Sequence, residues 1–308
     1  MWNLAGPVGA SRRPRPVLVR LLAGLCGLGL GVGFLFIGLI IPAYSLPPLV
    51  EQLPAGPQGE KIRLDLQALA EGYGAAIKKV VRQGPERYAL LMADGQLIPY
   101  DDGRRKGPEE MLADPDLEDM LSQPYLPGRP ASSPQPLQDP GRVRVTAFFQ
   151  AVYGRSAAAV QSQLVPVPFV GTVVRFQGRN GAAAALGRVG VRLHRLLAMQ
   201  PALRAYLVPI QGTYTYRRIA GTDRLSAHSW GIAIDVAKGA YWRWGGLLSP
   251  VELLALQRAY PQEIIQAFEA EGFIWGGKWY HYDTMHFEYR PELLAKARLQ
   301  GRGPVPAP

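Results

Sequence analysis

SAHSWGIAID, residues 226–235, places an imidazole and a carboxylate within one short, otherwise apolar segment. His228 lies seven positions before Asp235, and the 308-residue chain has only four histidines. In residues 231–236, isoleucines and a valine alternate with glycine, alanine and aspartate, which predicts a strand. Asp235 then points away from the isoleucines. Because an isolated buried carboxylate is costly, it needs a partner such as a lysine, a backbone cap or a metal ion.

A second stretch of the same kind is WYHYDTMHFE, residues 279–288. In residues 284–289, methionine, phenylalanine and tyrosine alternate with threonine, histidine and glutamate, which predicts another strand. Two strands with polar stripes of this kind would place His286 beside Asp235. Helices and strands do not alternate as βαβ units along the chain. We therefore predict an α+β fold in which a small antiparallel sheet carries the site and helices flank it.

The donor types in these two stretches fit a zinc ion. Catalytic zinc needs three protein ligands and an open position, and His228, Asp235 and His286 supply such a set. The only cysteine, Cys26, lies in an apolar N-terminal segment, so the rest of the chain has no thiolate to offer. Asp283, three residues before His286, is a natural general base for a metal-bound water. The alternative is a pair of buried His–Asp hydrogen bonds in a structural core.

The remaining polar residues near the motifs are weaker candidates. Along a strand, His281 and His286 differ by an odd number and would face opposite ways, unless a turn separates them. His194 has no acidic neighbour and is expected at the surface or half-buried. Ser226 is equally suited to a turn and to a substrate contact. The chain contains no H-E-x-x-H, so a helix-borne zinc site of that type is excluded.

The two motifs together resemble a known family of peptidases. S-x-H-x-x-G-x-A-x-D, followed by D-x-M-H-F-E, is similar to the zinc D-Ala-D-Ala carboxypeptidase and L-alanyl-D-glutamate endopeptidase family. This family shares its core fold with lysostaphin-type peptidases and the hedgehog signalling domain. The resemblance runs from roughly residue 212 to residue 292 and is weak before about residue 140. It implies that the three residues proposed above are zinc ligands.

The resemblance also implies roles for the neighbouring residues. Asp283 corresponds to the catalytic base, and His281 to a histidine that stabilises the transition state or supports the site in part of the family. Arg217 corresponds to an arginine that often precedes the first motif, although the adjacent Arg218 fits nearly as well. Glu288 shares a face with the second histidine ligand and is expected either to support it or to serve a structural role.

The function implied by the resemblance is hydrolysis of peptidoglycan stem peptides. D-Ala-D-Ala carboxypeptidase activity is favoured, because His281 and Asp283 have a carboxypeptidase-like spacing before the second motif histidine. L-Ala-D-Glu endopeptidase activity is the alternative within the family. The alternative from another class is an envelope-tethered zinc domain that binds cell-wall peptides without cutting them. Asp283 disfavours this last alternative, since a structural zinc site has no use for a spare carboxylate.

The N-terminus predicts export. Residues 21–41 carry no charge and are long enough to cross a bilayer, and the arginines before them predict that residues 1–20 stay in the cytoplasm. We therefore expect a membrane-anchored protein whose site lies outside the cytoplasm; a cleaved signal is the alternative. The formal net charge of +10 has no dense basic run, so nucleic-acid binding is not expected. No obligate protein partner is evident.

The rest of the chain divides by composition. We predict an N-terminal extension and Pro-rich linker over 42–140, a zinc peptidase domain over 141–300 and a flexible tail over 301–308. The local patterns predict a helix over 62–83, a hairpin over 87–100 with its turn at Asp94-Gly95, a loop over 124–140, and helices over 181–200 and 261–271.

Overall fold

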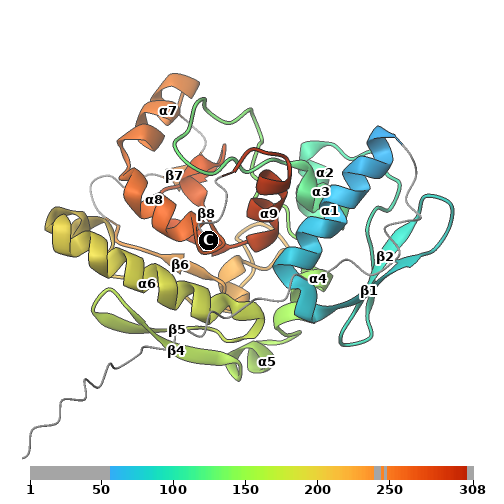
Figure 1. Ribbon diagram of the computed structural model, residues 1–308, viewed down its shortest axis with the longest axis horizontal. Coiled ribbons are helices and arrows are strands. Elements are labelled where there is room, and N and C mark those ends of the chain that lie inside the picture. The colour runs from blue at the N-terminus through green and yellow to red at the C-terminus, as the bar shows by residue number, and fades with distance from the viewer. Residues whose placement is uncertain (1–55, 239–243, 246–247, 304–308) are drawn as a thin grey trace, which may run out of the picture. The chain divides into compact units, whose positions relative to one another are not determined.

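The computed structural model describes residues 56–238, 244–245 and 248–303. This part of the chain has an α+β fold of helices and small antiparallel sheets, as predicted (Figure 1). The expected membrane segment, residues 21–41, lies outside the described residues. None of the helices in the described ranges is both long enough and apolar enough to cross a bilayer.

The sheet that carries both sequence motifs has three strands in the order β6 (Ala233–Asp235), β10 (His286–Tyr289) and β8 (Phe273–Trp275). The strands predicted over 231–236 and 284–289 are confirmed, although both are shorter than expected. β10 pairs antiparallel with β6, and His286 lies directly opposite Asp235. The prediction that these two residues are neighbours is therefore confirmed.

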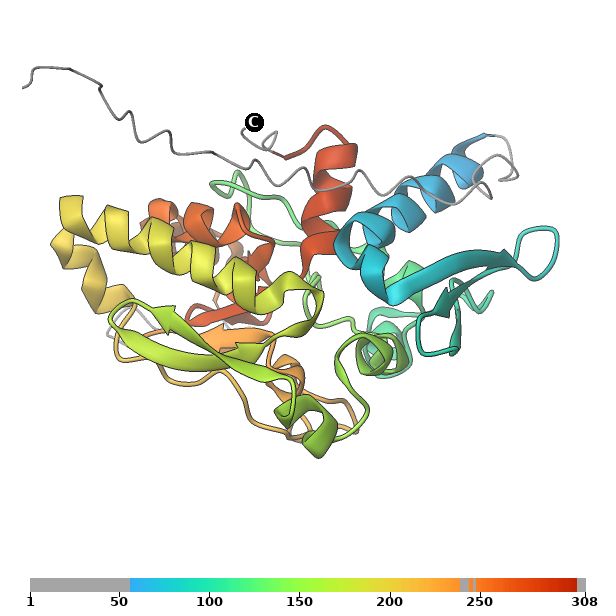
Figure 2. The ribbon, with the colours of Figure 1, turned by 60° about the horizontal axis from the view of Figure 1, so that its bottom comes forward.

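Two helices cover this sheet. α6 (Ala182–Met199) and α8 (Gln262–Glu269) confirm the helices predicted near these positions. Phe268 of α8 stacks on Phe287 of β10 with the ring centroids 3.8 Å apart. Helix α6 also packs on the hairpin of β4 (Leu164–Phe169) and β5 (Thr172–Gln177), as Figure 2 shows. His194, on α6, is exposed, as expected for a residue with no role in the site.

The N-terminal part corrects one prediction. Instead of one helix over 62–83, the chain forms α1 (Pro57–Tyr73) and then β1 (Ile77–Arg82). β1 is rich in β-branched residues and pairs with β2 (Tyr88–Met92), so a long-range partner determines its conformation. β2 continues into β3 (Leu97–Pro99) through the predicted turn at Asp94-Gly95, where Gly95 has φ 87°.

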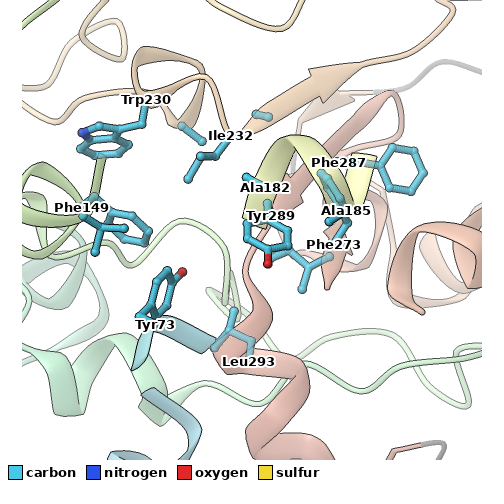
Figure 3. Packing of buried hydrophobic residues seen from close by; sticks show 14 of the residues in the cluster. Tyr73, Phe149, Ala182, Ala185, Trp230, Ile232, Phe273, Phe287, Tyr289 and Leu293 are labelled. Carbon is cyan, nitrogen blue, oxygen red and sulfur yellow. The ribbon is translucent and has the colours of Figure 1, made fainter. Parts of the chain in front are cut away.

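One hydrophobic core joins the segments before and after residue 140. α1 lies beside α9 (Pro291–Leu299) in Figures 1 and 2, and a Cβ on Gly72 would lie only 2.9 Å from the backbone nitrogen of Glu292. Figure 3 shows the rings of Tyr73, Phe149 and Trp230 in succession, with centroids 6.3 and 5.0 Å apart. Residues 56–140 thus pack against the part of the chain that carries the two motifs. The domain boundary at residue 140 stays a prediction.

The other elements are short. The stretch 124–140 contains no helix or strand, as predicted for a proline-rich loop. The remaining α-helices and strands of the described residues are α2 (Pro108–Ala113), α3 (Leu117–Ser122), α4 (Thr146–Tyr153), α5 (Ala157–Gln161), α7 (Pro250–Ala259), β7 (Trp244–Gly245) and β9 (Tyr282–Asp283). Most of the predicted C-terminal tail, residues 304–308, lies outside the described residues.

Candidate metal centre

The first motif folds as a short 3₁₀ helix, Ala227–Trp230, that presents His228. It begins at Ser226, whose hydroxyl accepts a hydrogen bond from the His228 backbone N–H, which gives this serine a turn role. It ends at Gly231, which has φ 67° and no room for a side chain, because a Cβ would lie 2.5 Å from Leu164. The serine and glycine of the motif therefore fix where the histidine points.

The two imidazoles converge on one carboxylate. His228 Nε2 lies 3.2 Å from one oxygen of Asp235, and His286 Nδ1 lies 2.9 Å from the other. The three side chains offer ligand atoms that all lie within 4.8 Å of one another, and no residue of the three is exposed. This set is therefore able to surround a single ion.

The outward-facing nitrogen of each imidazole lies near an oxygen atom. His228 Nδ1 lies 3.3 Å from the backbone oxygen of Thr213, and His286 Nε2 lies 3.6 Å from a carboxylate oxygen of Glu288. Histidines that bind metals usually donate their second N–H to a carbonyl or a carboxylate in this way. Glu288 itself is fully buried against Arg144, 3.1 Å away, so its own charge is compensated.

The electrostatics of the centre favour a positive charge at its middle. Burial raises the pKa of Asp235, but the hydrogen bonds to His228 and His286 outweigh it and hold that pKa well below its usual range. Burial lowers the pKa of His286, but the two carboxylates beside it raise it to about 9. Burial raises the pKa of Glu288, but Arg144 and His286 lower it to about 2. The acids therefore stay ionised and attract a cation.

A pocket of about 290 Å³ opens beside the three candidate ligands. Asp283, from β9, and Arg217 also line it. Gly276 lets the chain pass close to this point, since a Cβ there would lie 2.8 Å from the backbone oxygen of Asp283. The backbone of Arg217 is held by Ser229, whose hydroxyl accepts from its N–H at 3.0 Å and donates to its carbonyl at 2.8 Å.

The structure distinguishes Arg217 from its neighbour. Arg218 is exposed, pairs with the exposed Asp223 and is not part of the described wall of the pocket. His281 is also outside that wall. Its Nδ1 lies 2.6 Å from a carboxylate oxygen of Asp139, and its backbone N–H donates to the other oxygen at 2.8 Å. The structure thus brings Arg217, but neither Arg218 nor the His281 ring, to the described pocket wall.

Two charged wall residues were not predicted from the sequence: Arg142 and Arg144. The two arginines follow the proline-rich loop directly, in DPGRVR, residues 139–144. The two arginines are separated by one residue, Val143. In an extended segment this spacing places both side chains on the same face. A proline-rich composition says nothing about what such a segment packs against, so its place beside the centre was not foreseen.

An imidazole–carboxylate–imidazole set with a further carboxylate and an arginine in one pocket is an arrangement that could hold a metal ion beside a bound ligand. A comparison with known protein families adds independent evidence about this part of the chain. Residues 220–289 match a family model described as D-alanyl-D-alanine carboxypeptidase. The resemblance inferred from the two motifs is therefore confirmed for this segment, which spans both motifs. Neither curated proteins nor solved structures gave a match to the chain.

Proposed function

We propose that the protein is a zinc-dependent peptidase that hydrolyses peptidoglycan stem peptides, removing the terminal residue of D-Ala-D-Ala. The observation that carries this proposal is the convergence of His228, Asp235 and His286 on one point, with Asp283 in the same pocket. The family match covers these four residues and supports a peptidase in general. Zinc dependence is general in that family, and two imidazoles with one carboxylate are a donor set that zinc accepts.

In this proposal His228 Nε2, one oxygen of Asp235 and His286 Nδ1 hold the metal. Their outer nitrogens lie near oxygens of Thr213 and Glu288, a placement that favours the tautomer that each imidazole needs as a ligand. Zinc bound there supplies a Lewis acid for the scissile carbonyl and acidifies a water molecule. The chain's own residues perform the remaining tasks.

Asp283 is the proposed general base. Its place in the pocket wall suits a carboxylate that takes a proton from the attacking water and returns it to the leaving amine. Arg217 is the proposed anchor for the substrate's terminal carboxylate, which a guanidinium binds through two parallel charge-assisted hydrogen bonds. Ser229 holds the backbone of Arg217, so the side chain starts from a fixed point.

His281 keeps a conditional role in the proposal. Because Asp139 accepts from Nδ1, the opposite nitrogen donates a hydrogen bond to an oxyanion only when the ring is protonated. The side chain is 40% exposed and so is open to a substrate that extends beyond the described pocket wall. We propose oxyanion stabilisation by His281 on these grounds.

The deciding experiment is mass spectrometry of pentapeptide muropeptides after incubation with the purified, zinc-loaded protein. Loss of one alanine from the peptide end supports the carboxypeptidase. Cleavage between L-Ala and D-Glu instead would assign the endopeptidase activity. A chain that holds zinc and leaves every muropeptide intact would overturn the proposal in favour of a binding domain.

We further propose that residues 21–41 anchor the protein in the membrane with the peptidase part outside the cytoplasm. The proposal rests on the uncharged 21-residue segment and the arginines before it. A reporter fused after Pro308 should be active only when it is exported. Activity of a cytoplasmic reporter at that position would contradict a role on mature cell wall.

A further inference from the structure

Arg142 is a cation in the pocket that the hydrolytic step does not require. Its position is well defined. Nη2 donates to the backbone oxygen of His281 at 2.8 Å, and the guanidinium lies over the ring of Trp279, 5.3 Å from the centroid. Its own carbonyl accepts from Arg224 at 3.2 Å. A half-buried arginine fixed in this way is preorganised to bind a ligand.

The segment that carries Arg142 is docked on residues 279–281, at the start of the second motif stretch. The backbone N–H of Tyr280 donates to Gln138 at 2.9 Å, and the carboxylate of Asp139 accepts both hydrogen bonds from His281. Gly141 lies so close to Trp279 that a side chain there would overlap the indole ring. The end of the proline-rich loop is therefore part of the site, and it brings Arg142 with it.

Arg142 forms no ion pair with the residues that the structure describes. Arg144, on the same segment, pairs with Glu288 at 3.1 Å. Among residues 56–238, 244–245 and 248–303, by contrast, no carboxylate lies within 4 Å of the guanidinium of Arg142 or of Arg217. Within these ranges Nη1 of Arg142 also has no hydrogen-bond partner, and it is not sealed from solvent as Nε is. One donor of a fixed fork is thus left for a ligand.

We infer that Arg142 is a specificity-determining residue that binds a second carboxylate of the substrate, while Arg217 binds the first. This inference rests on the proposed function. Both guanidinium groups line one pocket of about 290 Å³ and neither has an ion-pair partner among the described residues, so each is able to accept a carboxylate of the substrate. Each forms charge-assisted hydrogen bonds to a carboxylate, so a diacidic peptide satisfies both at once.

Stem peptides offer two sources for the second carboxylate. One is the α-carboxylate of the D-Glu residue at position two, and the other is the side-chain carboxylate of diaminopimelate at position three. The test uses four pentapeptides, L-Ala-γ-D-Glu-X-D-Ala-D-Ala, in which X is lysine or diaminopimelate and the D-Glu carboxylate is free or amidated. kcat/KM is measured on each with the full, zinc-loaded chain.

For the unaltered protein we expect removal of the recognised carboxylate to lower kcat/KM by about 10- to 100-fold, the range for a charge-assisted hydrogen bond. The pair of peptides that shows this decrease in kcat/KM identifies which carboxylate Arg142 binds. Arg142→Gln should abolish the difference between the paired peptides, and Arg142→Lys should keep part of it, since the charge remains but the guanidinium that fixes its position is lost. Arg218→Gln, at an exposed arginine outside the described wall, should discriminate as the unaltered protein does.

The inference is overturned if the unaltered protein treats all four peptides alike, or if Arg142→Gln lowers kcat/KM by the same factor on all of them. Failure of the proposed function has a different signature, because no peptide is then hydrolysed. In that case the Kd of each of the four peptides is measured by calorimetry, and the unaltered protein and the Arg142 variants are compared in the same way. Zinc content and melting temperature establish that each variant is folded, and Arg142→Lys carries the test if Arg142→Gln does not fold.

Discussion

Two regions of the molecule gather possible metal-ligating side chains within 4.8 Å of one another, and they differ in what compensates the charge of their carboxylates. In the N-terminal region the acids surround a lysine. Lys106 has a fully buried ammonium group 2.8 Å from Asp102, 3.2 Å from Asp116 and 2.7 Å from Asp119. At the candidate metal centre, Asp235 instead faces two imidazoles.

The difference separates a structural cluster from a binding site. The lysine is covalently attached and permanently charged, so the N-terminal acids are already satisfied and also cap α3 through Asp116 and Asp119. Imidazoles are neutral or charged according to what occupies the centre, and an ion is able to replace the proton. Carboxylates that lie close together therefore do not by themselves identify a metal site. The groups that face them, a lysine in one region and two imidazoles in the other, make the distinction.

The largest effect should follow from removing a ligand at the candidate centre. We expect His286→Ala to lose its zinc and its activity, because two ligands do not hold the ion. Asp102→Asn, in the lysine-centred cluster, should keep about one zinc ion per chain and full activity. Metal analysis of the two purified variants is the measurement. Equal zinc content in both would break the comparison.

Asp283→Asn should have the next largest effect, and it separates a base from a ligand. Turnover of a pentapeptide should fall by roughly 10²–10⁴-fold, the usual range for loss of a general base. Zinc content should stay unchanged, since the amide removes only proton transfer. A zinc-free Asp283→Asn protein would mean that this carboxylate coordinates the metal, and the role assignment would be wrong.

Much of the centre could be predicted because its signals are local. The alternation in 231–236 and 284–289 reports which side chains share a face, and that was enough to place His286 opposite Asp235. The turn at Asp94-Gly95 depends on glycine at a positive φ, which is likewise a local property.

The predictions that failed or were missing depended on distant partners. Residues 77–82 form a strand because β2 pairs with them, and no pattern within 62–83 reveals that pairing. Arg142 reaches the pocket because Asp139 and Gly141 dock on residues about 140 positions later in the chain. Composition identified this stretch as a loop correctly, but the loop's contacts are a property of the whole fold.

Lys106→Met tests the structural half of the comparison. It leaves buried acids without their cation, and we expect the free energy of unfolding to fall by about 3–5 kcal/mol. Lys61 also contacts two acids, Asp65 and Glu118, but its side chain is 36% exposed. Lys61→Met should therefore cost no more than about 1 kcal/mol. Urea unfolding of both variants measures the difference, and equal losses would show that burial of Lys106 adds nothing.

The smallest effect concerns acid. Burial raises the pKa of Asp102, but the hydrogen bonds from Lys106 and from the Arg104 backbone outweigh it, so that pKa lies below its usual range. A lowered carboxyl pKa contributes stability that is present above the unfolded value, near pH 4, and is lost as pH falls through the folded value.

Asp102→Asn lacks this contribution at every pH. The unaltered protein should therefore be more stable than Asp102→Asn at pH 6 by less than about 1 kcal/mol, because the side chain is partly exposed. Urea unfolding between pH 6 and pH 3 should show that advantage shrinking toward zero as acid is added. An advantage that stays constant over this range would mean that Asp102 contributes by packing, and that the lysine-centred cluster is not held by charge at this position.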